Sequence, residues 1–182
     1  MSHIFLMPPR SGRIFLCCSM FDFLGIWPET NNTSADIDLS TFKYVFGIVR
    51  DPIDSICSTV AMTNSGSTLH NDINAAIQKY NSFAEVMIKE NIIIYKFDDL
   101  KNKTEKVLRD IADIMSINIE KEFDYNSIIK KLDSFEKDNP HGYKKTFSNT
   151  NKYELAEQVV LGTDLNYTYS LYNKLLHKAE LI

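Results

Sequence analysis

Two short segments of the sequence combine arginine with residue types that favour the binding of an anion. Only four of the 20 basic residues are arginine, and three of them lie in these segments, at Arg10, Arg13 and Arg50. The guanidinium group is a planar fork that binds phosphate or carboxylate through two parallel hydrogen bonds, which a lysine ammonium cannot do. Because the chain uses lysine at most other basic positions, these arginines indicate two places for a phosphate-like group.

The first segment, residues 8–14, joins an apolar run at 4–7 to a longer apolar stretch at 14–24. The run predicts a buried strand and the stretch a buried helix. The start of a helix offers backbone N–H groups and a positive dipole end to an anion, and Gly12 permits close approach of the backbone. The same pattern also fits an ordinary strand-to-helix turn. The signature GxxxxGK[ST] is absent, so hydrolysis of Mg-ATP is not indicated.

The second segment begins at Arg50, directly after a strand predicted over 44–49. In open α/β sheets, ligands bind beyond the carboxyl ends of the strands, which is where Arg50 is expected. Asp51 can cap the helix predicted over 53–62, and Ser58 lies two turns along that helix. Arg50 and Ser58 could therefore close on one phosphate from two sides, although helix capping alone explains the acidic residues of the segment.

The remaining pattern predicts strands that alternate with helices. Apolar residues repeat with a helical period over 72–90, and the apolar run at 92–95 predicts a strand inside a parallel sheet. Asn102 and Glu105 have the spacing of a capping box before a helix over 103–117. Less regular stretches predict a loop or short helix at 25–42, a helix and then a loop at 118–150, and helices at 151–160 and 165–181. This order predicts an α/β fold with a parallel sheet and right-handed crossovers.

Together, the two segments resemble the sulfotransferases that use 3′-phosphoadenosine 5′-phosphosulfate (PAPS). The loop that binds the 5′-phosphosulfate in that family is P-[KR]-[ST]-G-[TS]-[TS], and residues 9–14 of this chain are Pro-Arg-Ser-Gly-Arg-Ile. The family's motif for the 3′-phosphate, R-[DN]-P-x-D-x-x-x-S, is matched in full from Arg50 to Ser58. A weaker similarity is to the family's Y-x-[DE]-L segment, at 95–100. The match spans about residues 3–117.

The resemblance implies one domain over 1–182 with a three-layer α/β/α fold of the P-loop type, made of a core at 1–117 and a helical part at 118–182. It implies PAPS as the donor, no metal, and a small-molecule or glycan acceptor. Arg10 takes the place of the loop lysine that steadies the bridging oxygen as the sulfuryl group leaves. The residues implied at the donor are Pro9, Arg10, Ser11, Gly12, Arg13, Ile14, Arg50 and Ser58, with Tyr143, Lys144 and Lys145 from a basic loop near the C-terminus.

The sequence departs from the family's pattern in two places. Arg13 and Ile14 replace the usual loop hydroxyls, and only 37 residues separate Gly12 from Arg50, where relatives insert the strand and helix that carry the catalytic base. His70, in the polar break beyond the second motif, is the candidate for that base, although its surroundings favour a surface histidine. The acids within the gap are interpreted as solvated: Asp22, Glu29, Asp36 and Asp38.

Three functions therefore stay open. The first is a compact, active sulfotransferase. The second is a degenerate relative that binds a nucleotide or anion, or has a structural role, without turnover, and the short gap and missing base favour it. The third is a P-loop kinase of a small molecule, which the absence of a Gly-Lys-[Ser/Thr] end opposes. Use of PAPS without Mg²⁺ separates the first function from the third, and turnover separates it from the second.

The overall composition limits the class of protein. A chain with 44% hydrophobic and 24% charged residues is typical of soluble globular domains, and a net charge of −4 argues against binding along nucleic acid. No apolar window is long enough for a membrane span, and no cysteine spacing suits a metal, so a cytoplasmic protein is expected, with no indication of its oligomeric state. Two sets of side chains are predicted to be buried: the thiols of Cys17, Cys18 and Cys57, and the rings of Tyr167, Tyr169 and Tyr172.

Overall fold

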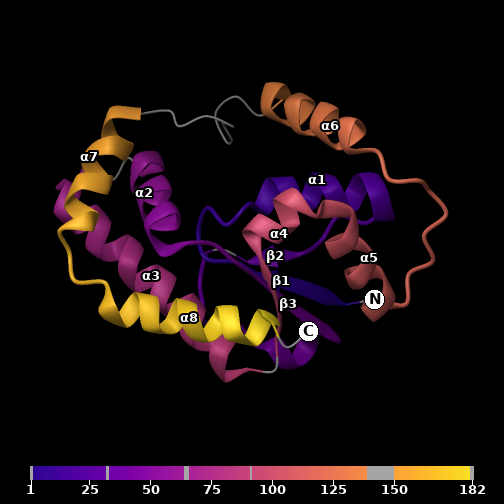
Figure 1. The fold of residues 1–182 in the computed structure, drawn as a ribbon, viewed down its shortest axis with the longest axis horizontal. Helices are drawn as coiled ribbons and strands as arrows, with labels where there is room; N and C mark the ends of the chain where they lie inside the picture. Colours follow the sequence, from indigo (N-terminus) through magenta and orange to yellow (C-terminus); the bar gives the residue numbers. More distant parts are fainter. Residues whose placement is uncertain (1, 32, 64–65, 91, 139–149, 181–182) are drawn as a thin grey trace.

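The computed structural model describes all residues except 1, 32, 64–65, 91, 139–149 and 181–182, and Figure 1 shows strands enclosed by helices. The strands are β1 (His3–Leu6), β2 (Thr30–Asn31), β3 (Tyr44–Val49) and β4 (Ile93–Lys96). The helices are α1 (Arg13–Leu24), the 3-10 helix η1 (Leu39–Thr41), α2 (Pro52–Met62), α3 (Leu69–Lys89), α4 (Phe97–Asn102), α5 (Thr104–Met115), α6 (Tyr125–Asp138), α7 (Thr150–Leu161) and α8 (Asn166–Glu180).

The four strands form one parallel sheet in the order β2-β1-β3-β4. β1 lies between β2 and β3, and its Phe5 is opposite Thr30 on one side and Phe46 on the other. β3 pairs in parallel with β4. Because all the strands run in the same direction, their carboxyl ends meet at one edge of the sheet. The segments that follow β1, β3 and β4 therefore start side by side, which brings the two arginine segments to one edge.

Helices cover both faces of the sheet, as the apolar strands require. Ile4 and Leu6 of β1 face a core shared with α2, α3, α7 and α8. Phe5 and Met7, the alternate residues, face a second core shared with α1, α4 and α5. α6 packs on α1 in the second layer of helices (Figure 1). The predictions of an α/β fold and of a parallel sheet are confirmed.

Two local predictions are wrong. Residues 25–42 contain the two-residue strand β2 and the short helix η1, where a loop or one short helix was expected. Asn102 does not cap the next helix, because it is the last residue of α4, a helix that starts directly after β4. Lys103 precedes α5 instead, and the Thr104 hydroxyl donates to the carbonyl of Leu100 at 2.8 Å.

Asp22 is not the solvated acid that was expected, since its side chain is only 2% exposed. Lys121 Nζ and Ser127 Oγ donate to its carboxylate at 3.1 and 2.8 Å, and Lys131 Nζ lies 3.6 Å away. Burial by itself would raise the pKa of Asp22, but the hydrogen bonds from Ser127 and Lys121, with the positive charge of both lysines, bring the pKa below its usual value. Asp22 thus anchors α6 to α1 through charge.

Burial of the cysteines is confirmed, and burial of the three tyrosines only in part. All three thiols are free and buried. Tyr167 is 58% exposed, and its hydroxyl donates to Glu85 at 2.8 Å. Tyr169 and Tyr172 are partly buried against the core. None of the helices in the described ranges is long and apolar enough to cross a membrane.

Candidate anion-binding site

The loop after β1 turns sharply into α1. Arg10 has a φ of 65° and Gly12 a φ of 87°, both in the left-handed region that side chains other than glycine rarely adopt. Within the described chain no side chain caps α1, whose N-cap residue is Gly12, and the first turn holds no acidic residue. The first N–H groups of this helix therefore present a positive dipole end, and the helix's own first turn holds no acidic side chain to neutralise it.

Two features require glycine at position 12: its positive φ and the close packing of the Phe97 ring. A Cβ atom on Gly12 would lie 2.2 Å from Cε2 of Phe97, the first residue of α4. The Phe97 ring centroid also lies 5.1 Å from Cζ of Arg50. Phe97 thus packs against both arginine segments. Phe97 lies inside the weakly similar segment at 95–100, but no feature of the sequence indicated that its ring would lie between the two arginine segments.

The segment after β3 forms the N-terminal cap of α2, as its sequence predicted. Asp51 caps α2 by accepting hydrogen bonds from the backbone N–H groups of Ile53 and Asp54 at 2.9 and 3.3 Å, and Pro52 is the first helical residue. Arg50 Nη2 is 3.1 Å from Asp54 Oδ2, and the Arg50 side chain is only 22% exposed. The second acid of the motif therefore orients the guanidinium group.

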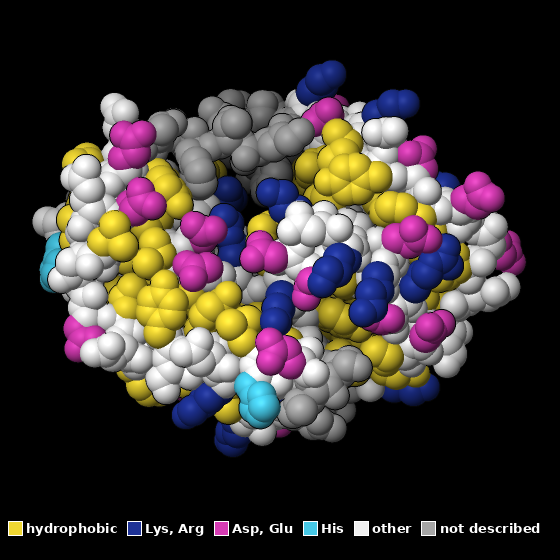
Figure 2. Space-filling model, viewed as in Figure 1, with side chains coloured by type: hydrophobic (Ala, Val, Ile, Leu, Met, Phe, Trp, Pro, Cys, Tyr) yellow, Lys and Arg dark blue, Asp and Glu magenta, His cyan; other side chains and the backbone are white. Residues whose placement is uncertain are grey.

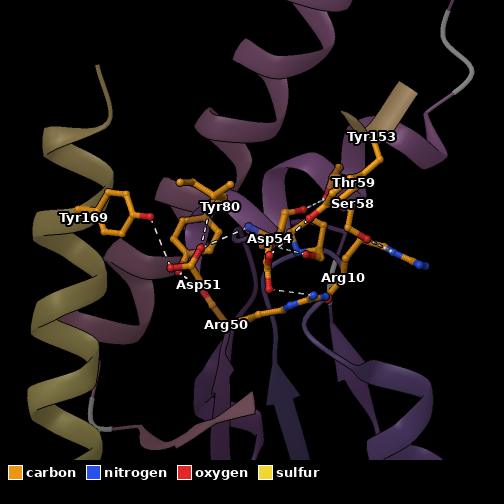
Figure 3. A network of polar contacts seen from close by, with 12 residues as sticks. Arg10, Arg50, Asp51, Asp54, Ser58, Thr59, Tyr80, Tyr153 and Tyr169 are labelled. Atoms are coloured by element: carbon orange, nitrogen blue, oxygen red, sulfur yellow. Dashed lines mark hydrogen bonds and ion pairs between the residues drawn. The ribbon is translucent and has the colours of Figure 1, made fainter. Parts of the chain in front are cut away.

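Three side-chain hydrogen bonds join the two segments (Figure 3). Arg10 Nε donates to Ser58 Oγ at 3.0 Å, and Arg50 Nη1 donates to the backbone carbonyl of Arg10 at 3.1 Å. Ser55 Oγ donates to the carbonyl of Pro9 at 2.5 Å. Ser58 thus contacts Arg10, whereas the sequence paired it with Arg50. Figure 2 shows a recess in this face of the molecule, between α1 and α2, with basic side chains along its wall.

Each segment keeps one buried donor that no protein group satisfies. Ser11 Oγ and Arg50 Nε are buried and have no hydrogen-bond partner among the residues that the structure describes, and Ser11 is only 1% exposed. Buried donors are nearly always paired, because an unpaired one costs about 1–3 kcal/mol. These two donors lie at the same sheet edge, where an acceptor of hydrogen bonds would satisfy both.

Tyrosines from three helices support the second segment (Figure 3). The hydroxyl of Tyr80 on α3 donates to the backbone carbonyl of Arg50 at 2.7 Å. The hydroxyls of Tyr153 on α7 and Tyr169 on α8 lie 3.4 Å from carboxylate oxygens of Asp54 and Asp51. Burial, and then the negative charge of the neighbouring aspartates, raises the pKa of Tyr153 and of Tyr169 to about 12, so both stay protonated and donate.

These tyrosines were missed by the sequence analysis, because they lie 30 to 118 residues from the groups they contact. No local pattern connects positions so far apart. The clustering of Tyr167, Tyr169 and Tyr172 was visible in the sequence, but it was interpreted as core packing.

The other predicted site residues take different positions. Arg13 is the exposed first residue of α1, and the Ile14 side chain is buried in a cluster with Leu132, so only the backbone of Ile14 is left to a ligand. His70 is exposed on the first turn of α3 rather than in a loop. Tyr143, Lys144 and Lys145 lie outside the described residues.

Comparisons with known proteins add no family to this geometry. No protein-family model matches the chain, and no curated protein matches it either. Across the described ranges, no cluster of three or more His, Cys, Asp or Glu side chains is arranged to hold a metal ion. The function must therefore be argued from the residues of the site.

Proposed function

We propose that this chain binds PAPS at the carboxyl edge of its sheet and is a compact sulfotransferase with a P-loop-type three-layer fold. One observation carries the proposal. The two motif segments meet at that edge, and each keeps a buried donor, Ser11 Oγ or Arg50 Nε, that has no partner in the described part of the chain. A ligand with two separate anionic groups accounts for both donors.

The residues present fit such a ligand. The start of α1 and Ser11 Oγ offer donors to a 5′-phosphosulfate, and Arg10 supplies a cation beside them. Arg50 Nε and Ser58 Oγ offer donors to a 3′-phosphate. The absence of a Cβ at Gly12 lets the loop lie close to Phe97. Ser58 would then exchange its hydrogen bond from Arg10 for one to the ligand.

When bound, this donor supplies a sulfuryl group, which passes in line to an acceptor hydroxyl or amine as the bond from sulfur to the 5′-phosphate oxygen breaks. Arg10 would stabilise the negative charge that develops on that oxygen, and preorganised donors of this kind are often the largest contribution to catalysis. The acceptor must also lose a proton. His70, exposed on the first turn of α3, stays the candidate base, although none of its contacts in the described structure joins it to the two arginine segments.

A relative that binds the nucleotide without turnover is the second candidate, and the region after β2 favours it. β2 ends at the same sheet edge as β1, but its last residue is Asn31, whose amide oxygen accepts hydrogen bonds from the backbone of Thr33 and Ser34. Asp22, the second acidic residue back along the chain from Asn31, forms an ion pair with Lys121. The amide of Asn31 is not basic enough to take a proton from an acceptor, and the carboxylate of Asp22 is held by that ion pair.

Thermal-shift titration with adenosine 3′,5′-bisphosphate, followed by transfer assays with labelled PAPS, separates these functions. Stabilisation with transfer to an acceptor, independent of Mg²⁺, supports the sulfotransferase. Stabilisation with no transfer across a broad panel of acceptors supports the binding protein. A preference for ATP with Mg²⁺ would indicate the kinase. No stabilisation of folded protein at millimolar bisphosphate would overturn the proposal.

A further inference from the structure

We infer that Tyr153 on α7 is a positioning residue for Arg50, acting through Asp54, and that it sets the affinity of the site for a 3′-phosphate. The inference rests on the proposed function, since the ligand is the one proposed above. It concerns a helix that lies beyond residues 3–117, the part of the chain that carries the sulfotransferase resemblance.

Both oxygens of the Asp54 carboxylate have a partner (Figure 3). Oδ2 is 3.1 Å from Arg50 Nη2, and Oδ1 is 3.4 Å from the Tyr153 hydroxyl. The Asp54 side chain is 49% exposed, so little packing restricts its rotation. The hydroxyl of Tyr153 therefore helps to decide which way the carboxylate faces.

Tyr153 is itself held in place by its neighbour on α7. Lys152 Nζ donates to the backbone carbonyl of Thr63, at the end of α2, at 2.7 Å, and to Asp72 Oδ2, on α3, at 3.0 Å. The Asp72 side chain is only 4% exposed, so this ion pair is largely shielded from water. The first turn of α7 is thus fixed to both helices next to the site.

The orientation of Asp54 matters because one nitrogen of the Arg50 guanidinium, Nε, has no hydrogen-bond partner among the described residues. Arg50 Nη1 and Nη2 are engaged by Arg10 and Asp54, whereas Nε has no partner in the described chain. A carboxylate prefers to bind a guanidinium through two parallel hydrogen bonds, and Nε and Nη2 form one such edge. Without the Tyr153 hydroxyl, Asp54 can turn to occupy that edge. It would then compete with the ligand phosphate and repel it.

The test compares two ligands on matched variants. Dissociation constants are measured by calorimetry for adenosine 3′,5′-bisphosphate and for adenosine 5′-monophosphate, which lacks the 3′-phosphate. Tyr153→Phe should bind the bisphosphate about fivefold more weakly, the usual effect of one hydrogen bond, and the monophosphate unchanged. Tyr167→Phe, which removes an exposed phenol that contacts Glu85, should change neither constant.

A second comparison tests the route through Asp54. In an Asp54→Asn background, the further change Tyr153→Phe should have no added effect, because the competing carboxylate is absent. An additive effect there, or an equal loss for both ligands in Tyr153→Phe, would overturn the inference. So would an unchanged bisphosphate affinity in a Tyr153→Phe protein that melts like the wild type. Failure of the wild type to bind the bisphosphate would overturn the proposed function, and the inference with it.

Discussion

Arg10 and Ser58 lie 48 residues apart, and Arg10 Nε donates a hydrogen bond to Ser58 Oγ at 3.0 Å. The bond joins the residue expected at the 5′ end of a donor nucleotide to a residue expected at its 3′ end. A ligand that occupied both positions would separate them and replace this bond with charge-assisted ones to its own oxygens. Under the proposed function, this bond between Arg10 and Ser58 would therefore break when the donor binds.

Arg50→Ala should abolish stabilisation by adenosine 3′,5′-bisphosphate, because it removes the partly buried guanidinium of the second segment. A ligand at 100 times its dissociation constant adds about 2.7 kcal/mol to the free energy of unfolding of the wild type, and this gain should vanish in the variant. Thermal shift measures it. Arg109→Ala is the matched control, since Arg109 lies half-exposed on α5 and pairs with Glu105. Retained stabilisation in Arg50→Ala would place the ligand elsewhere.

Gly12→Ala should destabilise the protein more than Gly25→Ala does. Both glycines have positive φ, at 87° and 70°, so both variants incur the strain of a left-handed alanine, about 1–2 kcal/mol. Only at position 12 would the new Cβ meet another residue, at 2.2 Å from Phe97, whereas nothing lies within 4 Å at position 25. Overpacking adds about 1–3 kcal/mol. Urea unfolding of both variants gives the difference, and equal losses would contradict the close packing at Phe97.

The fold was predictable because its signals are local. The apolar run at 44–49 became β3 residue for residue, and the helical period at 72–90 became α3. β2 was not predictable, since two residues carry no period and pair with β1 only after the chain folds. For β2 a real element had no sequence signal, whereas for Asn102 a signal was present without the element. Its spacing to Glu105 matches a capping box, but the residue is the last one of α4.

The candidate site was predictable only as far as its two motifs extend. Arg10, Gly12 and Arg50 were found because their segments are contiguous in sequence. Phe97 and Tyr153 were missed, because each reaches the site from an element distant along the chain. Parallel topology brings such positions together at one edge, and a single sequence does not state which side chain will fill the space there.

Asp22→Asn should lower the free energy of unfolding at neutral pH and make it depend less on pH in the acid range. The ionised carboxylate is held by Ser127 and by two lysines, so its pKa in the folded protein is below the usual value of about 3.9. The stabilisation is therefore complete above about pH 4 and is lost as pH falls through the lowered pKa. The variant should lose about 1–3 kcal/mol at pH 7, because the partners become less well satisfied.

The measurement is urea unfolding at a series of pH values from 7 downwards. Asp113→Asn, on an exposed position of α5, serves as the control and should leave both stability and its pH dependence unchanged. If Asp22→Asn retained the acid-dependent loss of the wild type, Asp22 would not be its source.

The three thiols should resist alkylation in the folded protein. Burial raises the pKa of Cys17 to about 12 and that of Cys57 to about 11, and it raises the pKa of Cys18 as well. Because the thiolate is the reactive form, few of these groups ionise at pH 8. A thiol-specific chromogenic reagent should therefore titrate all three only after denaturant is added. Rapid reaction of one thiol in native buffer would show that its helix opens.

Ser55→Ala and Ser58→Ala should separate stability from binding, although both serines are 1% exposed on the same helix. Ser55 Oγ holds the Pro9 carbonyl, so its loss leaves a buried acceptor unpaired and should cost about 1–3 kcal/mol of stability. Ser58 Oγ accepts from Arg10, whose guanidinium is partly exposed and keeps access to water. Ser58→Ala should therefore cost less stability, yet weaken bisphosphate binding several-fold, through loss of a charge-assisted hydrogen bond. Calorimetry and urea unfolding on both variants give the two quantities. The reverse pattern, with binding lost in Ser55→Ala and retained in Ser58→Ala, would exclude Ser58 from the phosphate site.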